Sequence, residues 1–256
     1  MKVVQMMKVV QLATVFLFML AAFQFSHAAE ENTPKKEKRF SNETNFALFN
    51  TTGNTDALTV AGKYKMKYKF TDKWAGSWVV GTLYGKSDGD KNAERYFTDL
   101  RADYSINDRW YAYGLGTWLR DEFAGFDNRL SIGPGVGHKF LIGPKHFLIA
   151  ETGLNYAYED YTDSDEDNED FLEGRLFGKY EWAFTEKTKF SQALEYLQSF
   201  NDSSMRKLNS ETALVTAITD ILALKISYSI FYNNDPRPSD LDDTDTILAT
   251  SLVITY

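Results

Sequence analysis

The chain of 256 residues contains no cysteine. This absence excludes disulfide cross-links, zinc–thiolate centres and thiol catalysis, and it is common in proteins that cross an oxidising periplasm unfolded. Histidine is also scarce, since only His138 and His146 follow residue 28. Basic residues are outnumbered, with 28 Lys and Arg against 36 Asp and Glu, for a net charge of −8. A chain this acidic lacks the basic footprint that nucleic-acid binding requires, so we expect no nucleic-acid partner.

Long hydrophobic runs are confined to the amino terminus. Lys2 and Lys8 precede an apolar run from Leu12 to Phe25, and small residues follow up to Ala28. This order is typical of a secretory signal peptide, and we expect cleavage near residue 28. An uncleaved anchor helix is the alternative. No later stretch approaches 18 apolar residues, so the sequence predicts no transmembrane helix in the exported protein.

The pentapeptide MKVVQ occurs at residues 1–5 and again at residues 7–11. The repeat indicates either a small duplication or a true start at Met7. Residues 29–42, rich in charged and polar side chains, are expected to form a flexible periplasmic leader, and the folded domain is expected to span residues 43–256.

A long two-residue alternation gives the clearest structural signal. Between Leu58 and Phe70 the even positions are almost all apolar, whereas the odd positions include four lysines. Successive side chains of a strand point to opposite faces, so the stretch predicts a strand with one apolar and one cationic face. It is roughly twice the usual strand length of about 5–6 residues. A bilayer on one side and a polar barrel interior on the other explain this pattern better than a soluble sandwich.

Short turn signals recur at regular spacing along the chain. They are Thr71-Asp72-Lys73, Asn107-Asp108-Arg109, Gly143-Pro144-Lys145, Thr185-Glu186-Lys187 and Thr219-Asp220. Longer polar connections alternate with them at Gly53–Thr55, Ser87–Asn92, Glu122–Gly125, Tyr161–Glu169, Asn201–Ser204 and Asn233–Asp242. Short turns at one end and longer loops at the other are the outer-membrane pattern. The sequence therefore predicts an all-β, antiparallel up-and-down transmembrane β-barrel of about twelve strands, with short periplasmic turns and longer extracellular loops.

Aromatic residues gather near both expected strand ends. The turn-end group is Tyr68, Phe70, Trp74, Tyr104, Trp110, Trp182 and Phe184, and the loop-end group is Tyr84, Tyr96, Tyr156, Tyr158, Phe200 and Tyr232. Such groups are candidate interfacial girdles. The last strand ends the chain on Tyr256, and a terminal aromatic strand resembles the assembly signal of bacterial outer-membrane barrels.

Four further segments stand out: Thr51-Thr52-Gly53-Asn54-Thr55, Asp121-Glu122-Phe123-Ala124-Gly125, Gly133-Pro134-Gly135-Val136-Gly137, and Glu151-Thr152-Gly153 with Tyr156. As a set, over roughly residues 45–256, they resemble the family known as salt-induced outer membrane proteins, a porin-like barrel domain of unknown function. The resemblance implies the outer membrane of a Gram-negative bacterium, with lipid, lipopolysaccharide and the barrel-assembly machinery as partners. It implies no catalytic or ligand-binding residues.

Charged side chains on the non-apolar faces are the candidate functional residues. Facing them toward lipid would cost several kcal/mol each, so they are expected to line the barrel interior. They are Lys63, Lys65, Lys67, Lys69, Arg95, Asp99, Arg101, Asp103, Glu151, Arg175, Lys179, Glu195, Glu211 and Lys225. Two hypotheses fit this set. Mutual neutralisation would close the interior, whereas a water-filled path would draw small ions toward the lysines.

Other chemistry is poorly supported. Both histidines are expected near the Gly143-Pro144 turn on the lipid side, away from the outer rim where a hydrolase would act. The acidic segment Glu159–Asp170 departs from an EF-hand at the required glycine and the final glutamate, so it is a solvated loop or a loose site for divalent ions. We therefore expect no enzyme, no cofactor and no dedicated metal site. A narrow channel with a lysine-rich interior is the main hypothesis, and a closed barrel with acidic surface loops is the alternative.

Overall fold

In a computed structural model, residues 39–51 and 57–255 are described. They form twelve strands and one short helix: β1 (Phe40–Thr51), β2 (Ala57–Lys69), β3 (Trp74–Ser87), β4 (Asp90–Ser105), β5 (Trp110–Asp121), η1 (Glu122–Ala124), β6 (Phe126–Ile142), β7 (His146–Tyr161), β8 (Glu169–Ala183), β9 (Thr188–Ser199), β10 (Arg206–Ala217), β11 (Leu222–Asn233) and β12 (Thr244–Thr255). The first strand begins inside the segment expected as leader. The expected signal peptide lies outside the described residues, as does the connection at Gly53–Thr55.

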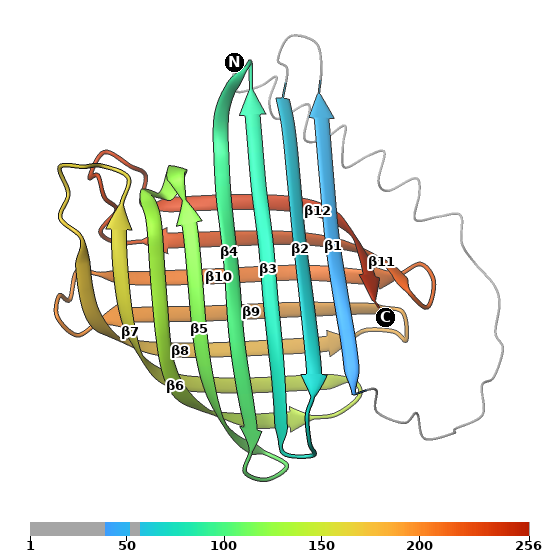
Figure 1. The fold of residues 1–256 in the computed structure, drawn as a ribbon. Coiled ribbons are helices and arrows are strands. Elements are labelled where there is room, and N and C mark those ends of the chain that lie inside the picture. Colours follow the sequence, from blue (N-terminus) through green and yellow to red (C-terminus); the bar gives the residue numbers. More distant parts are fainter. Residues whose placement is uncertain (1–38, 52–56, 256) are drawn as a thin grey trace, which may run out of the picture. The chain divides into compact units, whose positions relative to one another are not determined.

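Each strand pairs in antiparallel fashion with the next, and β1 pairs with β12, which closes the barrel. The closing register joins Glu43 to Thr255 and Phe46 to Leu252. In Figure 1 the front strands β1–β4 run crosswise to the rear strands β8–β10, as expected when all strands tilt against the barrel axis. The shortest strands have 12 residues. At about 3.3 Å per residue and a tilt of about 45°, they rise roughly 28 Å, close to the hydrocarbon thickness of a bilayer.

The five predicted short turns are all present, at residues 70–73, 106–109, 143–145, 184–187 and 218–221. One expected loop is wrong, because β3 and β4 are joined by Asp88 and Gly89 alone. Both residues have positive φ, at 53° and 92°, which suits a two-residue hairpin. The polar residues around them belong to β3 and β4, although their hydrophilic composition is typical of a loop. The Glu122–Gly125 connection is compact as well, with η1 ending at Gly125 in the left-handed region.

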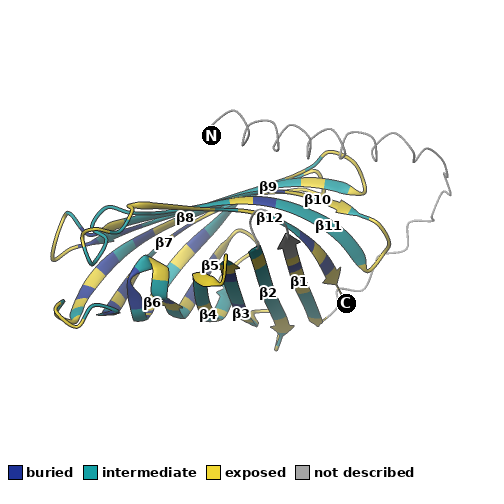
Figure 2. Ribbon diagram, turned by 90° about the horizontal axis from the view of Figure 1, so that it is seen from above, coloured by how far each residue is buried: buried dark blue, intermediate teal, exposed yellow. Residues whose placement is uncertain are grey.

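The two faces of the sheet differ as predicted. Apolar side chains at even positions project outward with large exposed fractions, including Leu100 at 61%, Ile132 at 68% and Leu248 at 72%. Charged side chains at odd positions turn inward, and Glu159 and Glu173 are almost fully buried. Figure 2 shows this alternation as dark and light bands along β6 and β7. An exposed apolar exterior around a buried charged interior is stable only when lipid covers the exterior.

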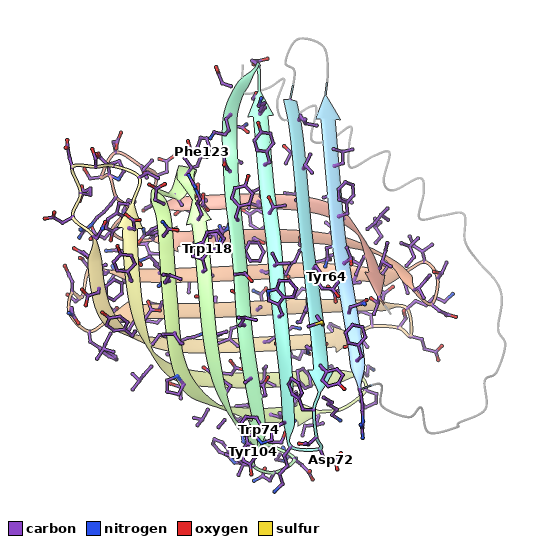
Figure 3. All side chains as sticks on the ribbon, viewed as in Figure 1. Tyr64, Asp72, Trp74, Tyr104, Trp118 and Phe123 are labelled. Carbon is purple, nitrogen blue, oxygen red and sulfur yellow. The ribbon has the colours of Figure 1, made fainter. Side chains whose placement is uncertain are left out.

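The predicted turn-end girdle is a run of touching rings. Trp74 and Tyr104 have centroids 5.0 Å apart, and Trp182 lies 4.1 Å from Phe184. Figure 3 shows Trp74 and Tyr104 together at the turn end, with Trp118 and Phe123 toward the other end. Aromatic rings at this level suit the boundary between headgroups and acyl chains. Within the described ranges, no helix is both long and apolar enough to cross a membrane.

Candidate functional site: the charged barrel interior

Several side-chain contacts join strands that are not neighbours in the sheet, and such contacts must cross the barrel interior. Arg101 of β4 binds Glu151 of β7, and Lys207 of β10 binds Glu159 of β7. Arg175 of β8 reaches the hydroxyl of Tyr113 on β5. Most of these contacts belong to two ion-paired networks.

The central network consists of Arg101, Asp103, Glu151, Arg175 and Glu195. Arg101 binds Glu151 with two nitrogens, at 3.0 and 2.8 Å, and also pairs with Asp103 at 2.8 Å. Arg175 pairs with Glu151 at 2.9 Å and with Glu195 at 2.7 Å. Paired nitrogen–oxygen contacts from a rigid guanidinium fix orientation as well as charge. The network therefore ties together the walls formed by β4, β7, β8 and β9.

Two tyrosines of β5 complete this network. The Tyr111 hydroxyl donates to Glu151 at 2.7 Å, and the Tyr113 hydroxyl accepts from Arg175 at 2.9 Å. The Arg101 guanidinium lies 4.2 Å from the centre of the Tyr113 ring, within the range of a cation–π contact. Carboxylates, guanidiniums and phenols thus share one polar layer.

The glycine-rich segment of β6 explains where these rings fit. A Cβ on Gly135 would come 2.2 Å from Tyr113, and one on Gly137 would come 2.2 Å from Tyr111. Any larger residue would collide with the rings. The Gly-Pro-Gly-Val-Gly motif is therefore a seat that lets two aromatic rings lie against the inner wall.

The loop-side network consists of Arg129, Glu159, Glu173 and Lys207. Arg129 pairs with Glu159 at 2.7 Å and with Glu173 at 2.7 Å, and Lys207 pairs with Glu159 at 2.6 Å. Neutral side chains donate further hydrogen bonds to the two carboxylates. They are Tyr161 on Glu159 and both Ser131 and Asn155 on Glu173. Two cations match two anions, so this buried cluster is neutral and closely hydrogen-bonded.

The loop between β11 and β12 closes over the interior at the same end. Arg237 in this loop pairs with Glu169 at 2.7 Å and lies 5.4 Å above the Tyr161 ring. Its carbonyl oxygen approaches Gly125 so closely that a Cβ there would come within 1.9 Å. Desolvation opposes the charge of Arg237, but Tyr161 and Glu169 raise its pKa above the ordinary value. Beneath the loop lies a cavity of about 90 Å³, lined by charged side chains such as Arg95 and Lys207.

The turn half of the interior is different because its lysines outnumber nearby acids. Lys63, Lys65 and Lys67 of β2 form no ion pair within 4.0 Å among the described residues. Lys179 of β8 pairs with its near neighbour Glu181 at 2.5 Å, and Lys225 of β11 pairs with Glu211 at 2.9 Å. The positive charge of the interior is thus concentrated toward the short turns.

The remaining predicted interior residues take varied positions. Arg95 pairs with Asp121 at 3.2 Å near the loop end and stacks 4.1 Å from Phe231. Asp99 lies within electrostatic reach of Lys63, Arg175 and Glu195. Lys69 is the last residue of β2, at the turn end.

Several interior residues are not among the predicted ones, including Glu43, Tyr111, Tyr113 and Lys207. Tyr111 and Tyr113 were overlooked because β5 does not show the usual apolar alternation, its outward positions being small residues such as Gly114. Lys207 was overlooked although it shares the odd numbering of Glu211 on the same strand, a signal that could have found it.

The residues considered for other chemistry lie elsewhere. His138 lies between the rings of Trp110 and Phe140, with centroids 4.4 and 4.7 Å away, and His146 contacts the Tyr180 hydroxyl at 2.8 Å, so both belong to the turn-end girdle. Glu159, first in the acidic segment, is an interior residue and not part of a loop. No group of three or more His, Asp or Glu side chains in the described ranges is placed to hold a metal ion.

A closed, even-stranded antiparallel barrel with an apolar exterior and a charged interior defines the class: this is a transmembrane β-barrel of the bacterial outer-membrane type. The chain belongs to the family described as "Protein of unknown function, DUF481", whose profile matches residues 44–256. This confirms the family resemblance noted from the sequence. A relative from Escherichia coli K12, "Uncharacterized protein YdiY", is 31% identical over 166 residues. That match spans 65% of this chain and 64% of the relative, less than two thirds of its length.

Solved structures show the same architecture. An outer membrane channel from Pseudomonas putida F1 has a TM-score of 0.52 at 11% identity, covering 89% of this chain and all of that chain. The NanC porin has a TM-score of 0.51 at 12% identity, covering 84% of this chain and 97% of the porin. The translocator domain of the autotransporter NalP from Neisseria meningitidis has a TM-score of 0.50 at 11% identity, covering 87% and 90%. At these identities the likeness concerns the fold alone.

Proposed function

We propose that this protein is a narrow outer-membrane channel that favours small anions and is held constricted by its central and loop-side networks. The observation that supports the proposal is the uneven charge of the interior. Arginines and carboxylates pair across the interior, whereas Lys63, Lys65 and Lys67, from the middle of β2 toward its turn end, form no ion pair within 4.0 Å among the described residues. A row of unpaired cations in a narrow polar path lowers the energy of anions and raises that of cations.

Conductance in a planar bilayer tests this function. We expect the refolded protein to give small current steps whose reversal potential favours anions. Replacing Lys63, Lys65 and Lys67 by glutamate should shift the preference toward cations. The matched control replaces Lys73, Lys145 and Lys187 on the exposed turns, which makes the same charge change at the same end outside the interior. Equal shifts in both triple variants would contradict an interior selectivity filter.

A closed structural barrel is the second candidate, and the nearly complete burial of Glu159 and Glu173 favours it. The variant R175A/E195A separates the candidates, because it removes one arm of the central network. A constricted channel should conduct more when this arm is absent. If neither the wild type nor this folded variant conducts, the closed barrel is the better description, and the acidic loops are then the part that interacts with other molecules.

The proposal includes export by a signal peptide ending near residue 28 and insertion by the barrel-assembly machinery. In this orientation the turns face the periplasm, and the loops meet lipopolysaccharide outside. Protease added to intact cells should then cleave the 162–168 loop and spare the turns. Cleavage confined to the turns would reverse the orientation.

A further inference from the structure

The lysines of the turn half come from opposite walls of the barrel. Lys65 and Lys67 lie on β2, and Lys179 lies on β8, six strands away in a closed ring of twelve. Nevertheless, Lys179 is close enough to act electrostatically on both Lys65 and Lys67. The interior is therefore narrow at this level, and like charges face each other across it. We refer to Lys65, Lys67 and Lys179 as the turn-side lysines.

Nearby carboxylates, namely Glu43, Asp103, Glu181 and Glu211, balance these charges only in part, because most of them also pair with other cations of the interior. Glu43 lies opposite Lys65 in the β1–β2 register and accepts a hydrogen bond from Asn45 at 2.9 Å. Glu181 is held by Lys179, and Asp103 is held by Arg101 of the central network. Two further lysines lie near this end of the interior: Lys139 is 5.8 Å from the centre of the Tyr111 ring, and Lys189 acts electrostatically on Glu181. Repulsion between facing ammonium groups costs free energy that a bound anion would relieve.

Access to this level is available from the turn end. Lys67 is exposed, whereas the loop end is covered by the Arg237 loop and filled by the loop-side network. A solute that reaches the turn-side lysines therefore enters from the side of the short turns.

We propose that the turn-side lysines bind a short linear polyanion carrying carboxylate or phosphate groups, held between β2 and β8. Alternate residues of a strand are about 7 Å apart, so Lys65 and Lys67 present two charges at that spacing along one wall. Lys179 supplies a third from the opposite wall. A single small anion would meet one or two of these groups, whereas a molecule with three charged groups would meet all of them. The proposal rests on the anion-favouring channel proposed above and names its solute class.

Binding can be measured without any current. The full-length protein, refolded in detergent, is titrated calorimetrically with tripolyphosphate and, separately, with 1,2,3-propanetricarboxylate. We expect saturable binding that weakens as salt is added, because the Debye length falls to about 8 Å at 0.15 M. In K65Q/K67Q the affinity should fall about tenfold or more, as expected when two charge-assisted contacts are lost. K179Q should weaken binding as well, which a site confined to β2 would not show.

The matched control is K73Q/K145Q, which removes two exposed lysines at the same end of the barrel. It should bind as the wild type does. Equal losses in this control, or no saturable binding of either probe by the wild type, would overturn the site. A preference for one probe identifies phosphate or carboxylate as the recognised group.

The outcomes for the site and for the channel are separable. Lysine-dependent binding with no current in bilayers would keep the site and reject the channel. Anion-selective current without lysine-dependent binding would keep the channel and reject the site.

Discussion

Replacing Arg129 by methionine should destabilise the barrel strongly, because Arg129 is the cation that joins two buried carboxylates. It is 8% exposed and pairs at 2.7 Å with both Glu159 and Glu173. After the change, Glu159 keeps its ion pair with Lys207, but Glu173 has no ion pair left among the described residues and keeps the neutral donors Ser131 and Asn155. Leaving a buried charge without its partner typically costs about 3–5 kcal/mol of folding free energy.

The size of the loss can be assigned by adding Glu173→Gln to the same chain. The amide removes the stranded charge while keeping an acceptor for the neighbouring donors. Replacing a whole buried ion pair by uncharged groups of similar volume is often close to neutral. We therefore expect R129M/E173Q to recover a large part of the stability that R129M loses, giving a double-mutant coupling of about 0.5–3 kcal/mol.

Urea unfolding of the protein folded into lipid vesicles measures these differences, with tryptophan fluorescence as the signal. Arg120→Met is the control, because the Arg120 side chain is 48% exposed and its ion pair with Asp127 is long, at 3.7 Å. Its effect should stay within about 1 kcal/mol. The reasoning is refuted if R129M costs no more than R120M, or if adding E173Q deepens the loss.

Three further predictions follow from other parts of the barrel. Gly135→Val should lower the free energy of unfolding by about 1–3 kcal/mol, because its side chain collides with Tyr113. The control Gly114→Val, whose Cβ meets nothing within 4 Å, should lower it less in the same urea titration, and equal losses would rule out the ring seat. Arg237→Ala removes the ion pair with Glu169, so proteinase K should cut the loop at residues 234–243 several-fold faster in the folded variant than in the wild type. An unchanged rate would mean that other contacts hold the loop. Variants that keep Trp74 or Trp78 as the single tryptophan should differ in fluorescence quenching by brominated lipids, because the two residues lie about 13 Å apart along one face of β3. Bromines near the headgroups should quench Trp74 best, and deeper bromines should quench Trp78 best; identical depth profiles would contradict the placement of the girdle.

The exterior of the barrel could be predicted from the sequence because the bilayer acts on each residue separately. A side chain such as Leu100 or Leu172 is favoured on its face by lipid, whatever its neighbours are. The alternation therefore survives in nearly every strand, and the strand number follows from the turns. The same reasoning failed at Asp88-Gly89, where polar composition indicated a loop and two positive φ values gave a hairpin.

Pairing inside the barrel could not be predicted, because it depends on how far each strand is shifted against the next. Arg101 and Glu151 are three strands apart, and they meet only when the accumulated stagger brings both to one level. The residue pattern along a single strand contains no information about this accumulated stagger. The glycine seat is a similar case, since Gly135 and Gly137 acquire a reason only when Tyr111 and Tyr113 are known to face them.

The contrast between the two halves of the interior indicates where function resides. A barrel needs its interior filled or hydrated, and the Arg129 and Arg101 networks fill it with charges that satisfy each other. A lysine facing another lysine serves no such purpose, because it raises the energy of the folded state. Lys65, Lys67 and Lys179 are therefore the side chains that barrel stability explains least. If they were merely tolerated, replacing one by glutamine would stabilise the protein at no functional cost. If they hold an anion, the same replacement would stabilise the empty barrel but weaken binding, so stability and affinity should change in opposite directions.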